Sequence, residues 1–130
     1  MMTEQRRVRP EEADIEDVAT NIDGPFSLAY AGSLAAEDVV RRWPGPHRTA
    51  IRLVLDRRLP PSAWRRELTR FRGREWAKRA LGWKDRIPPI IVGSFSIGGR
   101  TVYDVFDGWG RTNYAMMTGY PLHVWVVRAE

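Results

Sequence analysis

The sequence predicts an α+β domain built on a small mixed β-sheet with helices. Three local patterns support this prediction. The apolar run at 90–92 indicates a buried strand, and Gly98-Gly99 indicates a two-residue hairpin. The pattern at 107–118 is typical of a glycine turn that opens a short helix. Because strands and helices do not alternate strictly along the chain, we expect a mixed sheet rather than a parallel one.

Residues 1–48 are expected to form an accessory N-terminal segment of helix, short strand and second helix. Early acidic residues favour the start of the first helix, and Gly24-Pro25 ends it. Apolar side chains alternate over 26–30, which indicates a brief strand. Ser33 is expected to cap a second helix that runs to about Trp43.

Residues 49–130 are expected to form the main domain. Gly73 is expected to kink its long helix, and Gly82 and Gly119 to end its two helices. The predicted elements, in chain order, are strand 50–56, helix 62–81, strands 90–97 and 101–106, helix 111–118 and strand 122–127.

Composition excludes several classes of protein. The chain has 130 residues, 43 % of them hydrophobic, which suits one globular domain. It has no Cys and two His, which excludes disulfides, thiolate metal sites, cysteine nucleophiles and multi-histidine metal sites. No apolar run reaches the roughly 18–20 residues of a membrane helix, and the N-terminus does not resemble a secretory signal. We therefore expect a cytoplasmic protein with no membrane partner.

Charge is distributed unevenly along the chain. Residues 1–38 hold three basic and nine acidic side chains, whereas residues 57–86 hold eleven basic and three acidic ones. Arginine, which forms paired hydrogen bonds with phosphate oxygens, supplies most of the basic charge. Segment 57–86 therefore predicts either binding of a polyanion such as DNA or a solvated helix face.

The turn Asp107-Gly108-Trp109-Gly110-Arg111-Thr112 has the most chemical content in the sequence. Glycines allow a sharp turn, and the backbone N–H groups of the helix that follows favour an anion such as phosphate. Arg111 would add a positive charge and Thr112 a hydroxyl, while Asp107 could hold a divalent cation. The alternative is an ordinary strand-to-helix turn in which Asp107 is a structural cap.

Several ordered motifs carry a resemblance to a known family. They are Pro89-Ile90-Ile91-Val92, Gly98-Gly99, the turn from Val105 to Arg111, Gly119, and Val124-Trp125-Val126-Val127. With them, residues 50–128 resemble the ParB/sulfiredoxin superfamily domain. The resemblance implies that nucleotide phosphate, of ATP or CTP, binds at the glycine turn. It also implies an ATPase or DNA nuclease type of activity, which in this chain would use Mg²⁺.

The family's functional positions can be carried over to this chain. Metal-assisted phosphate chemistry needs one or two carboxylates, so Asp107 is the first candidate to hold Mg²⁺ and to take part in catalysis, and Asp56 is the second. Arg111, the arginine of the family's motif, would neutralise phosphate charge during catalysis. The nucleotide-binding residues implied by the resemblance are Arg57, Arg65, Arg66, Thr69, Gly108, Gly110, Arg111 and Thr112. Trp109 is a further candidate, because an exposed indole could stack on a nucleobase; the alternative is packing against the sheet.

Two departures from the family's pattern limit the functions implied. Trp109 stands where sulfiredoxin needs a cysteine, so repair of oxidised cysteine is excluded. Gly110 stands where many members have His or Arg, which removes one phosphate donor or acid. Two hypotheses follow: a metal-dependent phosphohydrolase, or a catalytically silent module that binds DNA or protein. In the second, the basic segment 57–86 could also bind the acidic 1–38 segment of another protomer, giving a homodimer.

Overall fold

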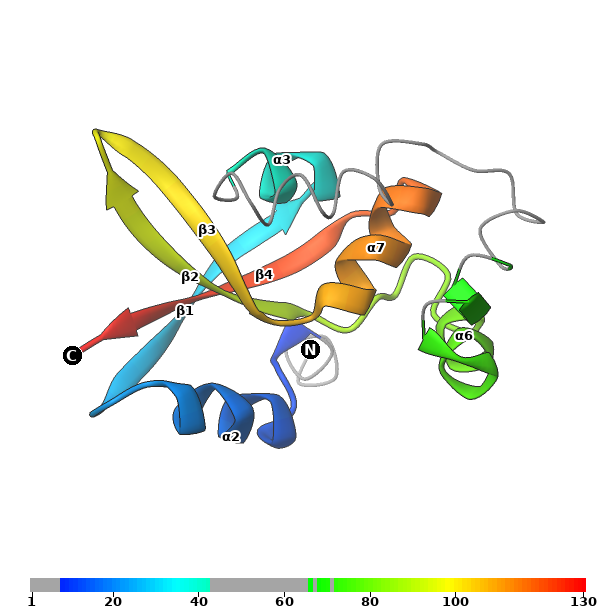
Figure 1. Ribbon diagram of the computed structural model, residues 1–130, viewed down its shortest axis with the longest axis horizontal. Helices are drawn as coiled ribbons and strands as arrows, with labels where there is room; N and C mark the ends of the chain where they lie inside the picture. The colour runs from blue at the N-terminus through cyan, green and yellow to red at the C-terminus, as the bar shows by residue number, and fades with distance from the viewer. Residues whose placement is uncertain (1–7, 43–65, 67, 71) are drawn as a thin grey trace.

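A four-stranded mixed sheet organises the computed structural model (Figure 1). The structure describes residues 8–42, 66, 68–70 and 72–130. Its elements are α2 (Glu12–Asn21), β1 (Phe26–Leu34), α3 (Ala36–Arg41), α6 (Arg74–Leu81), β2 (Ile90–Ile97), β3 (Arg100–Asp107), α7 (Trp109–Thr118) and β4 (Leu122–Ala129). The predicted strand at 50–56 lies outside the described residues.

The strand order in the sheet is β1-β4-β2-β3. β1 pairs with β4 and β2 with β3 in antiparallel fashion, whereas β2 and β4 run parallel. The chain passes from β2 to β4 through the β2–β3 hairpin and α7, which is the crossover that a parallel pair needs. The predicted α+β class with a mixed sheet is confirmed.

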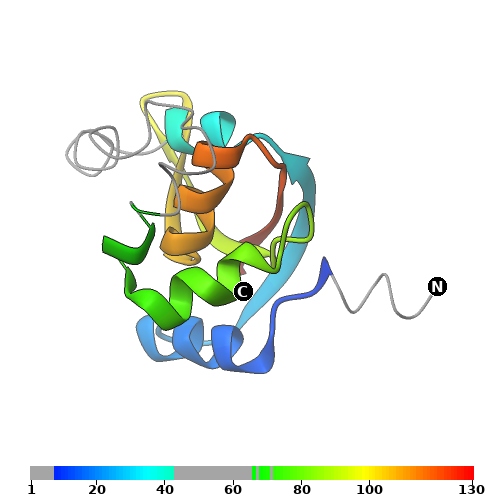
Figure 2. The ribbon, with the colours of Figure 1, turned by 90° about the vertical axis from the view of Figure 1, so that its right-hand side faces the viewer.

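Helices cover both faces of the sheet. α3 and α7 lie on one face, and α2 lies on the other (Figures 1 and 2). The larger core joins Val39 of α3 and Tyr114 of α7 to strand residues such as Ile90 and Val124, all buried. A smaller core packs Val18 of α2 against the opposite face of the sheet. α6 lies beside α7, and the ring of Trp83, which follows α6, packs edge-on against Tyr114 with centroids 5.5 Å apart.

The described part of the N-terminal segment, residues 8–42, belongs to the same sheet and core as the rest of the chain. β1 forms an edge of the sheet beside β4, and α3 contributes Ala36, Val39 and Val40 to the larger core. The segment that the sequence suggested as an accessory is thus an integral layer there. An apolar strand face needs cover, and α3 supplies it.

The predicted cap at Ser33 is wrong. Ser33 lies in β1 opposite His123, and α3 begins at Ala36. Pairing with β4 over the whole length of β1 outweighs the local preference of serine for a cap.

Other local predictions are confirmed. Gly98 and Gly99 form the hairpin turn, with positive φ angles of 57° and 77°. Gly73, at φ 91°, precedes the start of α6, as expected of a break in the long helix. Gly119, at φ 83°, ends α7, and its N–H donates to the carbonyl of Ala115 at 2.8 Å. Among the described residues, no helix is long and apolar enough to span a bilayer.

Candidate functional site

The glycine turn joins β3 to α7 and presses against β2. Gly108 is the N-cap of α7 at φ 114°, a backbone conformation that favours glycine. A Cβ at this position would lie 2.4 Å from Cγ2 of Ile90, which is fully buried. Gly108 therefore serves the close approach of the turn to the neighbouring strand.

Thr112, a predicted phosphate ligand, faces inward. Its side chain is 1 % exposed, and its hydroxyl donates to the carbonyl of Gly108 at 2.8 Å. The backbone N–H of Thr112 donates to the same oxygen at 2.9 Å. Thr112 thus closes the first turn of α7 and does not project toward a ligand.

Arg111 lies among oxygen atoms of its own chain. Its guanidinium donates to Asp107 at 2.5 Å, to both carboxylate oxygens of Asp14 at 3.4 Å, and to the carbonyl of Pro89. The side chains of Arg111, Asp14 and Asp107 are 14, 18 and 21 % exposed. The predicted phosphate-binding arginine is therefore neutralised by two carboxylates, one of which comes from α2.

Asp14 is the carboxylate most perturbed by this arrangement. Burial raises its pKa from 3.8 to about 6, and the neighbouring Asp107 contributes to the rise. Arg111 opposes the rise, because a nearby cation favours the ionised form. Burial thus outweighs the attraction of the guanidinium, and Asp14 titrates close to neutral pH.

Packing explains the residue at position 110. A Cβ on Gly110 would lie 2.5 Å from Cζ2 of Trp76 and 3.0 Å from Nε of Arg72. The side chain of a His or Arg at this position would therefore collide with Trp76. Trp109 is half-buried and packs against the larger core, the alternative to its predicted role of stacking on a nucleobase.

A pocket of about 240 Å³ opens beside Arg111, between α2, α6 and α7. Its lining combines two carboxylates, two guanidiniums and two indoles, from Glu11, Asp14, Arg79, Arg111, Trp76 and Trp83, together with Pro88. The two indole rings meet edge to face with centroids 5.3 Å apart. Sequence reasoning missed Glu11, Asp14 and Arg79, because no local pattern connects α2 with α6.

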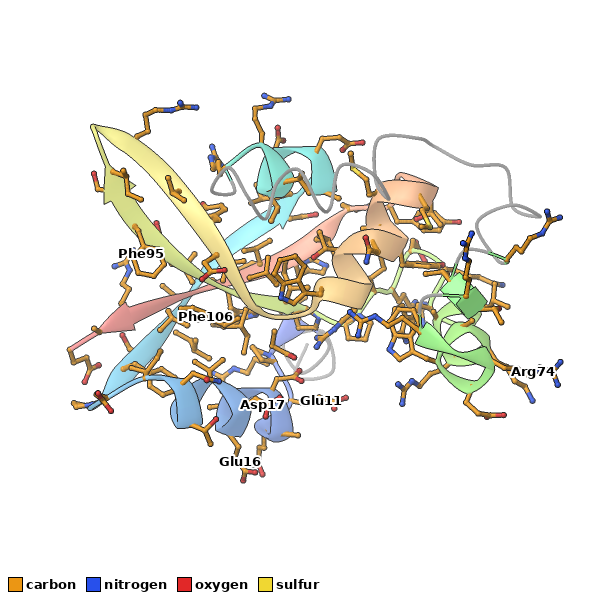
Figure 3. The ribbon with its side chains drawn as sticks, viewed as in Figure 1. Glu11, Glu16, Asp17, Arg74, Phe95 and Phe106 are labelled. Atoms are coloured by element: carbon orange, nitrogen blue, oxygen red, sulfur yellow. The ribbon has the colours of Figure 1, made fainter. Side chains whose placement is uncertain are left out.

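The described part of the basic segment exposes its cations to solvent. We use the name basic surface for the exposed side chains Arg66, Arg70, Arg72, Arg74, Lys78, Arg79, Lys84 and Arg86. In the ranges that the structure describes, ion pairs engage Arg41 and Arg111 and none of these eight. Arg74 points away from the body of the molecule (Figure 3).

The four predicted nucleotide-binding residues that precede α6 divide into two groups. Arg66 and Thr69 are exposed on the helical stretch before Gly73. Arg57 and Arg65 lie outside the described residues. Arg66 belongs to the basic surface, and the glycine turn packs at Gly110 against Trp76 and Arg72.

The glycine turn does not offer the free carboxylate that the expected Mg²⁺ would need. The carboxylate of Asp107 is already held by Arg111, so the residues present do not fit a resident metal ion. Within the described ranges, no group of three His, Cys, Asp or Glu side chains could hold a metal ion. Metal-assisted cleavage by Asp107 and Arg111 therefore stays a prediction that the geometry does not support.

Comparison of the chain with family models, with curated proteins and with solved structures found no match. The functional argument therefore depends on the geometry and charge described above.

Proposed function

We propose that this protein binds the phosphate backbone of a nucleic acid through its basic surface. The observation that carries the proposal is the set of eight exposed Lys and Arg side chains, which form no ion pair within the described residues. When such cations contact phosphates, the counterions condensed on the nucleic acid are released. This release favours binding whatever the base sequence.

The architecture of α6 supports this function. Ala77 and Ala80 are buried against the larger core, which fixes the helix and turns its other side outward. Arg74 and Lys78 are one helical turn apart on that outer side. Two cations at this spacing can contact phosphates along one strand of a backbone.

The test measures binding of a duplex DNA and a single-stranded RNA by fluorescence anisotropy at several salt concentrations. For the double variant Arg74→Glu/Lys78→Glu we expect about tenfold or more loss of affinity, and a log–log salt slope shallower by about 2. Both changes lie on an exposed helix face, so folding should be unaffected.

Arg100→Glu is the control on another element, and the single variant Arg74→Glu, with the same change in net charge, is measured beside it. Arg100→Glu reverses one exposed arginine on the β2–β3 hairpin, at a distance from α6 (Figure 1). This variant should retain nearly the wild-type affinity and salt slope. Equal losses in the single α6 variant and the hairpin control would show a diffuse effect of net charge and contradict the proposal.

A second candidate function is nucleotide binding in the pocket beside Arg111. It is favoured by the pocket itself, which places Arg79 and Arg111 beside two tryptophan rings. A phosphate that approaches Arg111 from the pocket competes with Asp14, which lines the pocket and contacts the guanidinium. Nucleotide affinity should therefore depend on the charge of Asp14.

Calorimetry with ATP and CTP tests this candidate. Asp14→Asn should raise nucleotide affinity over the wild type, because the competing carboxylate is gone, and Arg111→Ala in that background should abolish the gain. Asp17→Asn is the control, because Asp17 is exposed on the same helix. If Asp14→Asn binds neither nucleotide while folded, the candidate is rejected.

A further inference from the structure

The outer side of α2 and its flanks carries a surface of opposite sign. We use the name acidic surface for the exposed carboxylates Glu11, Glu12, Glu16, Asp17 and Asp23. The sequence has no Lys or Arg between residues 10 and 40, and the cation at the start of this surface is Arg9, which lines a hollow together with Glu12. Glu16 points away from the sheet (Figure 3).

The acidic and basic surfaces do not neutralise each other within one molecule. They border the same pocket, where Glu11 and Arg79 form part of the lining. Among the described residues, however, the ion pair that leaves α2 goes from Asp14 to Arg111, and none joins α2 to α6. The two surfaces therefore both face outward and remain available to a partner.

We propose that the acidic surface of one copy docks on the basic surface of a second copy. Charge complementarity supports a second copy as the partner. Every copy exposes both the five carboxylates of the acidic surface and the eight cations of the basic surface, so one copy offers the charges that the other attracts. Each copy carries both surfaces on either side of one pocket, so a contact in one direction leaves the reciprocal pair of surfaces unused. In a dimer with twofold symmetry, each acidic surface contacts the basic surface of the other copy, so no surface is left unpaired. In a head-to-tail arrangement, each copy contacts two others, and the assembly extends into a row of copies.

Self-association of this kind would compete with nucleic acid for the basic surface. It does not depend on the proposed function, because two copies can pair whether or not either binds nucleic acid. If both occur, excess nucleic acid should dissociate the assembly, since a polyphosphate offers a higher density of negative charge than α2.

The experiment measures the mass of the full chain by size-exclusion chromatography with light scattering. At about 0.05 M salt the wild type should show a mass above its 15.0 kDa monomer, and at about 0.5 M salt it should return to that monomer. A monomer at low salt, or an assembly that does not respond to salt, would overturn the proposal.

Two charge-reversed variants identify the surfaces. Glu16→Lys/Asp17→Lys removes much of the acidic surface, and Arg74→Glu/Lys78→Glu removes the centre of the basic surface. Each variant alone should be monomeric at low salt. Mixed in equal amounts, they should form a one-to-one complex, because the first retains the basic surface and the second the acidic one.

The mixture also separates pairing from misfolding, because misfolded variants would not complement each other. Arg100→Glu should associate like the wild type. A mixture that stays monomeric, or single variants that associate normally, would overturn the proposal. Glu16→Lys/Asp17→Lys should still bind nucleic acid, so loss of self-association and failure of the proposed function are read from different measurements.

Discussion

Arg111 and the arginines of the basic surface carry the same charge in two different settings. Arg111 is mostly buried and satisfied by Asp14, Asp107 and the carbonyl of Pro89. Arg74, by contrast, is exposed on α6, and no ion pair holds it within the described ranges. The motif arginine therefore stabilises the fold, while the cations of α6 are available for binding. A motif shows which residue type is present but not whether its charge is already used.

The largest expected effect tests whether the glycine turn is structural. Gly108→Ala forces a side chain into a left-handed conformation and against Ile90, and should lower the free energy of unfolding by about 4 kcal/mol. Gly99→Ala, at φ 77° with no described atom within 4 Å of the added Cβ, should cost about 1–2 kcal/mol. Urea unfolding of both variants measures the difference. Equal losses would mean that backbone strain alone accounts for Gly108.

The next effect tests the role of Arg111. Arg111→Ala leaves the carboxylates of Asp14 and Asp107 partly buried without their shared cation, and should cost about 3 kcal/mol of stability. Arg74→Ala removes an exposed cation and should change stability by less than about 0.5 kcal/mol. Urea unfolding at pH 7 compares the two. If Arg111→Ala is as mild as Arg74→Ala, Arg111 is not engaged, and the contrast between the two settings fails.

The smallest effect concerns Asp14 and pH. Its pKa is about 6 in the folded state, above its ordinary 3.8, so the folded state holds the proton more tightly. The contribution of this proton to stability is complete below about pH 4, declines as the pH rises toward 6, and is lost above about pH 6. Between pH 4 and 7, the stability of Asp14→Asn relative to the wild type should therefore rise by about 2 kcal/mol.

Thermal or urea unfolding of the wild type and Asp14→Asn across this pH range measures the effect. The control is Asp17→Asn, which removes an exposed carboxylate from the same helix outside the Arg111 site. If Asp14→Asn ran parallel to the wild type, Asp14 would be titrating as a surface carboxylate, and the site would be more open than the structure shows.

Local features were predicted well because their causes are local. Gly98-Gly99 forms a hairpin turn and Gly119 ends a helix, since both need backbone conformations that glycine adopts readily. α7 begins at Trp109, two residues before the start at Arg111 that the sequence predicts. Ser33 lies in a strand and not at the helix cap that the sequence predicts, because its pairing partner, His123, is far away in the sequence.

The candidate site was predicted only in part. Asp107, Gly108 and Arg111 do lie together at the start of α7, as the sequence suggested. The sequence could not show that Asp14 reaches Arg111 across a separation of 97 residues. Nor could it show that Trp76 packs against Gly110, which accounts for the glycine at that position.

The sequence by itself determined the order of the elements described, the sharp turns and the concentration of basic residues around α6, because these depend on residue type and near neighbours. Only the tertiary structure decided which charges remain available. Folding brings α2 against α7, where burial makes an unpaired charge costly and Arg111 is held by carboxylates. On the solvent side of α6 no such cost applies, and the cations there stay exposed.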